Sequence, residues 1–147
     1  MQLPAGATGF FGAGTFREPI SRKEFLQLVH RLVRESRCTV GETDTTLCGK
    51  NFYAAQIVRN SGTEILLMNA YTGHLACSDR WEAQPLQFTA PSAMLAALLP
   101  ADQLLSPALL GQSIDGVMLD ALTLAEQEQL RYWKPSTIGE ILFNFWD

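Results

Sequence analysis

Apolar side chains recur at helical spacing after residue 20, and they predict one long helix over 21–36. Ser21 and Glu24 stand at the spacing of a capping box, so we expect the helix to begin at Ser21. The apolar positions fall at i, i+3, i+4, i+7 and i+8 and would form a single buried stripe: Phe25, Leu28, Val29, Leu32 and Val33.

The pattern then changes to runs of β-prone residues. FYAAQIVRN (52–60) and TEILLMNAY (63–71) flank a short polar turn at 60–62, which predicts a hairpin. A second turn at 71–73 returns the chain through HLACS (74–78) as a third antiparallel strand. The run EILLM is apolar without alternation, as in a central strand that is covered on both faces.

Short helices are predicted in the second half of the chain, over 91–99, 106–110 and 123–133. Two prolines bound the first, Ser106 and Gly111 bound the second, and Thr123 with Glu126 forms a capping box for the third. The segment 82–90 is expected to be a connection, and Asp115 with Gly116 to be a turn between short strands.

The last seventeen residues, RYWKPSTIGEILFNFWD, are unusually apolar for a chain end. Apolar groups on both faces predict a strand within the sheet. If that strand lies near an edge, alternate aromatic side chains such as Phe143 and Trp146 would be available to a partner.

These elements predict an α+β fold with a single domain spanning residues 1–147. We expect an antiparallel sheet of about five strands, with the long N-terminal helix and several short helices packed on it. The 147 residues, 47% hydrophobic and 18% charged, suit one ordinary globular core.

Charge and cysteine content narrow the classes of partner. Eleven Lys and Arg against fifteen Asp and Glu give a net charge of −4, which disfavours nucleic acid as a partner and favours a basic protein.

No segment approaches the roughly 20 apolar residues of a membrane span, and the N-terminus lacks a signal-peptide pattern. Three widely spaced cysteines fit a reducing cytoplasm.

No specific catalytic, nucleotide or metal signature is present. The glycine-rich loop 5–14 lacks the Lys-Ser/Thr pair of a phosphate-binding loop. Cys38, Cys48, His74 and Cys77 lack the short ligand spacing of a zinc site, so we expect no metal and no cofactor.

An enzyme or small-ligand protein is the alternative class. It would use the glycine-rich loop and a pocket formed by His74, Cys77 and Asp79. The spacing argues against a His74–Cys77 pair, because residues three apart in a strand point to opposite faces.

The leading hypothesis is a small cytoplasmic protein without enzymatic activity that binds another protein. Its most concrete version is a bacterial immunity protein that binds and neutralises a cognate toxin. A secretion chaperone or adaptor would share the same features, and a homodimer formed through an edge strand is a third interpretation. The predicted partner-binding residues are acidic or aromatic: Glu42, Asp44, Tyr71, Asp79, Trp81, Phe143 and Trp146.

Overall fold

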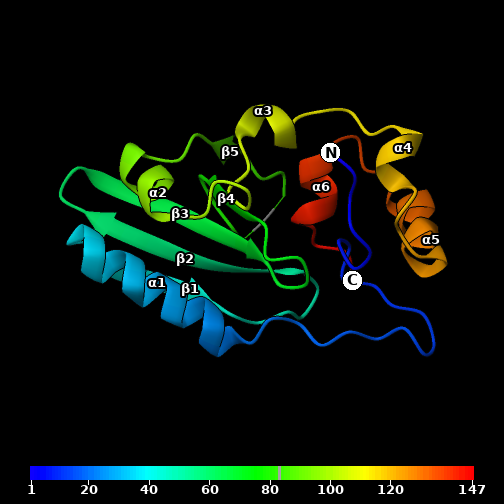
Figure 1. Cartoon of the computed structure of the whole chain (residues 1–147), viewed down its shortest axis with the longest axis horizontal. Helices are drawn as coiled ribbons and strands as arrows, with labels where there is room; N and C mark the ends of the chain where they lie inside the picture. Colours follow the sequence, from blue (N-terminus) through cyan, green and yellow to red (C-terminus); the bar gives the residue numbers. More distant parts are fainter. Residues whose placement is uncertain (83) are drawn as a thin grey trace.

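The described residues form a five-stranded antiparallel sheet whose strands lie in chain order, β1-β2-β3-β4-β5 (Figure 1). The computed structural model describes residues 1–82 and 84–147, without the side chain of Val117. Residue 83, inside the predicted connection 82–90, lies outside the described residues. The strands are β1 (Thr39–Asp44), β2 (Phe52–Arg59), β3 (Gly62–Asn69), β4 (Leu75–Ser78) and β5 (Phe88–Thr89).

The central hairpin and the meander are confirmed. β2 and β3 pair along their whole length, and the Arg59–Gly62 pair leaves a two-residue turn at 60–61. Gly62 has a φ of 142°, a conformation that glycine adopts without steric cost. β4 then pairs with β3, as the sequence predicts.

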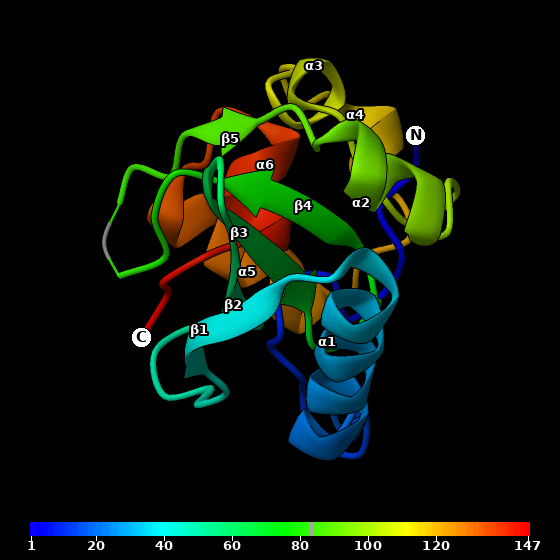
Figure 2. The same ribbon diagram turned by 90° about the vertical axis from the view of Figure 1, so that its left-hand side faces the viewer.

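The long helix α1 (Arg22–Ser36) covers one face of the sheet, together with the short α2 (Ala93–Leu98) (Figure 2). The Ser21 hydroxyl accepts a hydrogen bond from the Glu24 amide at 3.1 Å, which confirms the predicted start. Phe25, Val29 and Leu32 are fully buried against the sheet. The amphipathic stripe therefore fixes which face of α1 meets the strands.

The opposite face of the sheet is covered by the C-terminal half of the chain, which includes α3 (Pro107–Leu110), α4 (Gly116–Leu119), α5 (Leu124–Trp133) and α6 (Ile138–Leu142). In Figure 1, α6 lies against the sheet, and α4 and α5 lie farther out. Side chains alternate along β3, so that Ile65 and Leu67 join this layer while Leu66 and Met68 join the α1 layer. The prediction that EILLM is covered on both faces is confirmed.

The C-terminal run is a helix followed by irregular chain, so the predicted strand is wrong. Thr137 caps α6 by accepting a hydrogen bond from the Glu140 amide at 3.3 Å. Ile138, Ile141 and Leu142 follow at helical spacing and are fully buried. The capping signal outweighs the β-prone composition, because the i, i+3, i+4 stripe gives a five-residue helix one continuous buried face.

Other local predictions also need correction. The predicted connection 82–90 contains β5, and the acidic GETD segment, whose polar composition predicts a loop, belongs to β1. Asp115 does not mark a turn between strands. Its carboxylate accepts a hydrogen bond from the Met118 amide at 3.0 Å and so precedes α4, because a short acidic side chain satisfies the free amides of a helix start.

The helices predicted over 91–99, 106–110 and 123–133 are confirmed as α2, α3 and α5.

Three buried asparagines lock both ends of the chain into the fold. Asn51 Oδ1 accepts a hydrogen bond from the Asn144 amide at 2.9 Å. Asn144 Nδ2 donates to the Thr8 carbonyl at 3.0 Å, and Asn69 Nδ2 donates to the carbonyls of Ala7 at 2.9 Å and Leu142 at 2.7 Å. The apolar tail thus packs against its own core.

Candidate functional site

The predicted partner-binding residues do not form one surface. Glu42 and Asp44 lie on β1, at one edge of the sheet, whereas Asp79 and Trp81 follow β4. Strands β2 and β3 lie between them, so β1 and β4 are three strand spacings, or about 14 Å, apart. Tyr71 lies in the β3–β4 turn, half-buried, with its ring centroid 5.2 Å from that of Phe11.

Asp44 is already paired within the chain. Lys50 Nζ lies 2.7 Å from its carboxylate, and the amide and hydroxyl of Thr46 donate hydrogen bonds to it. Partial burial acts to raise the pKa of Asp44, but these donors and the Lys50 charge outweigh burial and lower that pKa. This carboxylate is therefore less available to a partner than its sequence position indicates.

Trp81, Phe143 and Trp146 are core residues, with exposed fractions of 5%, 2% and 6%. Phe143 packs against Phe52 at a centroid distance of 5.9 Å. As strongly buried side chains, Trp81 and Phe143 contribute mainly to stability. Phe143 and Trp146 differ from Trp81 because they also form part of a cavity wall.

The pocket predicted from His74, Cys77 and Asp79 is not formed. Cys77 has no exposed surface and faces the α1 layer, where burial, reinforced by the nearby Glu64 carboxylate, raises the pKa of its thiol far above the ordinary range. His74 Nδ1 lies 2.8 Å from the Thr72 hydroxyl, and partial burial lowers the pKa of the imidazole. Asp79 is exposed and pairs with Arg80 at 3.3 Å. These groups have separate surroundings and do not activate the thiol.

The amides of the glycine-rich loop bind the side-chain carboxylate of Glu126 from the same chain. The amides of Gly6 and Thr8 donate hydrogen bonds to the Glu126 carboxylate at 2.8 and 3.0 Å, and the Thr8 hydroxyl donates at 2.7 Å. Glu126 is fully buried. The position that a phosphate would need at these amides is therefore occupied by a side chain of α5.

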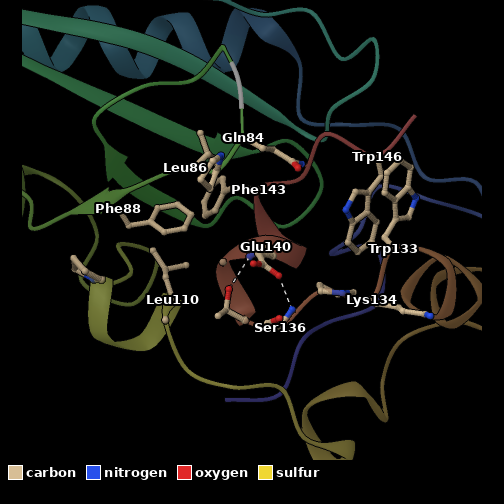
Figure 3. A pocket seen from close by; sticks show the side chains of 16 residues that line it. Gln84, Leu86, Phe88, Leu110, Trp133, Lys134, Ser136, Glu140, Phe143 and Trp146 are labelled. Carbon is tan, nitrogen blue, oxygen red and sulfur yellow. Dashed lines mark hydrogen bonds between the residues drawn. The ribbon is translucent and has the colours of Figure 1, made fainter.

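A cavity of about 720 Å³ lies beside α6, and we call it the aromatic groove (Figure 3). Its volume falls in the range of ligand sites. Its walls come from the segment after β4, from α3 with Gly111, and from the chain between the end of α5 and Trp146. The lining residues include Leu86, Phe88, Leu110, Trp133, Lys134, Glu140, Phe143 and Trp146.

A sharp turn between α5 and α6 positions the groove. Lys134 has a φ of 51° and ends α5 in the left-handed conformation, and Pro135 follows it. The Ser136 amide then donates a hydrogen bond to the Glu140 carboxylate. This turn places Trp133 at one end of the groove and brings Glu140 into it.

Two tryptophans form the most distinctive wall of the groove. The rings of Trp133 and Trp146 are stacked, with centroids 6.1 Å apart and planes only 3° from parallel. Trp133 is 36% exposed, while Trp146 is held in the core. Tyr132, 76% exposed, lies edge-on to Trp133 at 5.1 Å. The buried ring supports the exposed one and holds its orientation.

Glu140 and Lys134 are the charged residues of the wall. Figure 3 shows the Glu140 side chain in the middle of the lining residues, whereas the Lys134 ammonium is directed away from it. No salt bridge within the described part of the chain involves Glu140. The groove therefore combines apolar walls with one negative charge that lacks a cationic partner among those residues.

Sequence reasoning identified Trp146 and Phe143 but missed Trp133 and Glu140. One local signal was available, because Thr137 and Glu140 have the spacing of an N-cap and its third helical residue. The groove itself has no local signal, since its walls come from three segments, 84–88, 107–111 and 133–146, that are far apart in the chain.

A comparison with protein-family models, curated proteins and solved structures finds no match for this chain. Across residues 1–82 and 84–147, no three His, Cys, Asp or Glu side chains gather in a way that would hold a metal ion. None of the described helices has both the length and the apolar character of a membrane span.

Proposed function

We propose that this protein is a non-enzymatic module that binds another protein through the aromatic groove. The observation that carries this proposal is the stacked Trp133–Trp146 pair, with the exposed Tyr132 beside it. Tryptophan and tyrosine are the residue types most enriched in binding hot spots. A ring that is already held in place loses little conformational entropy when a partner binds.

The most concrete version of this proposal is a bacterial immunity protein that binds and neutralises a cognate toxin in the cytoplasm. The net charge of −4 supports a basic partner, because opposite charge accelerates encounter. The three free cysteines support a reducing compartment. A chaperone or adaptor for a secreted effector would use the same groove without being required to block a toxic activity.

The first experiment is capture of partners from the native cell with the tagged full chain. Tyr132→Ala combined with Trp133→Ala removes the exposed aromatic surface, and Leu124→Ala is the matched control. Leu124 is 79% exposed at the other end of α5, so its truncation removes an exposed apolar side chain outside the groove. Urea unfolding verifies that all variants remain folded.

We expect a stoichiometric protein partner that the control retains and the double variant loses. The partner is then expressed alone and together with this chain. Growth arrest that the wild-type chain relieves and the double variant does not relieve supports the immunity version. A harmless partner would contradict that version, and equal capture by all three chains would remove the aromatic groove as the binding surface.

A further inference from the structure

We propose that the aromatic groove receives a cationic side chain, a lysine or an arginine, from an exposed segment of its partner. This inference rests on the proposed function, because it assumes that the occupant is a protein. It goes further by naming the chemical group that the groove recognises.

The Glu140 carboxylate can accept a further hydrogen bond. Its Oε2 accepts a hydrogen bond from the Ser136 amide, and within the described residues no hydrogen bond to Oε1 is formed. Glu140 is exposed, so a cation can approach it from solvent. Its structural role at the start of α6 uses one oxygen and leaves the other for a charge-assisted hydrogen bond.

The walls of the aromatic groove suit a long cationic side chain. Trp133 and Trp146 supply indole rings, the aromatic groups that attract cations most strongly. Pro85, Leu86 and Phe88 provide apolar surface for the methylene stem of a long side chain. The carboxylate and the indole rings suit the charged end of a lysine or arginine side chain, and the apolar surface suits its methylene stem.

No basic side chain of the described residues forms a salt bridge with Glu140. Lys134 is the basic residue of the wall, and its ammonium points away from Glu140 (Figure 3). The whole chain carries a charge of −4, so the surrounding field also favours a positive group. The Glu140 charge would repel an anionic occupant and would form no ion pair with a neutral one.

The test uses two acetylated, amidated tripeptides, Gly-Arg-Gly and its citrulline analogue, which has nearly the same shape without the charge. Binding is followed by tryptophan fluorescence, because two of the three tryptophans line the groove. Glu140→Gln keeps an oxygen for the Ser136 amide and removes the charge. Glu128→Gln removes the same charge from an exposed position on α5 outside the groove.

We expect saturable binding of the arginine peptide, with the citrulline peptide weaker by about fivefold or more. Glu140→Gln should weaken the arginine peptide by about the same factor and abolish the difference between the two peptides. Glu128→Gln should change neither affinity. Trp133→Ala should weaken the binding of both peptides, because it removes a shared wall.

Equal affinity for the two peptides, or no response to either, overturns the inference. Tight binding of a neutral proline-rich peptide, or self-association through the groove detected by light scattering, overturns it as well. The peptide results do not bear on whether a partner is captured through Tyr132 and Trp133, so the two proposals fail in separate experiments. Self-association through the groove would contradict both proposals, and light scattering distinguishes that case.

Discussion

Burial separates the three cysteines into different chemical classes. Cys48 is exposed, Cys38 is half-buried and Cys77 is fully buried. Thiol reagents attack the thiolate, so a raised pKa and lost access both slow the reaction. The environment of each thiol, rather than its distance from a histidine in the sequence, sets its reactivity.

We predict that Cys48 is labelled first when the native protein meets a thiol reagent at pH 8, and that Cys77 is labelled only as the protein unfolds. Burial raises the pKa of Cys77, so the thiolate fraction at this pH is negligible in the folded state. Mass spectrometry of a time course identifies the modified residue, with Cys48→Ser as the control. Labelling of native Cys77 at the rate of a free peptide cysteine would contradict the structure.

At the scale of elements, α6 depends on the absence of a side chain at Gly139. A Cβ added there would overlap the ring of Phe88 and lie 3.1 Å from the Leu110 carbonyl oxygen. The glycine therefore allows α6 to approach β5 and α3 closely, which closes one side of the aromatic groove. Its role is close packing and not an unusual backbone conformation.

We predict that Gly139→Ala lowers the free energy of unfolding by about 1–3 kcal/mol, because the added methyl forces Phe88 or the helix to move. Gly116→Ala is the matched control. Gly116 begins another short helix, α4, and an added Cβ there meets no atom within 4 Å. Urea denaturation of both variants measures the difference, and equal midpoints would show that α6 has room to shift.

At the scale of the whole molecule, Glu126 joins the N-terminal loop to α5. Its carboxylate accepts hydrogen bonds from Gly6, Thr8 and Thr123 while it is fully buried. A buried charge is tolerated when several donors surround it. Residues 3–8, which include the fully buried Leu3, Ala7 and Thr8, are therefore anchored in the core.

We predict that Glu126→Gln destabilises the fold by about 2 kcal/mol or more, since an amide turns one acceptor into a donor that faces other donors. Glu128→Gln, two residues along the same helix and exposed, should cost no more than about 0.5 kcal/mol. Urea unfolding compares the two variants with the wild type. Coincident midpoints for the two substitutions would contradict the role of Glu126.

The sequence by itself determined the features that depend on residues four or fewer positions apart. Ser21 with Glu24 and Thr123 with Glu126 fixed two helix starts, and the turn at 60–62 fixed the hairpin. These signals are reliable because a cap or a tight turn satisfies backbone groups that lie next to it in the chain. The α+β class and the two-sided covering of β3 follow from the same local patterns.

Tertiary structure alone decided which aromatic residues reach the surface and which acidic residues lie close together on it. Trp81 and Trp133 are both plausible contacts in the sequence, yet one is 5% exposed and the other 36% exposed. Glu42 and Asp79 are separated by the order of the strands, and the aromatic groove is assembled from distant segments. The physical reason is that burial and proximity depend on which elements pack together, and the pattern within one element does not contain that information.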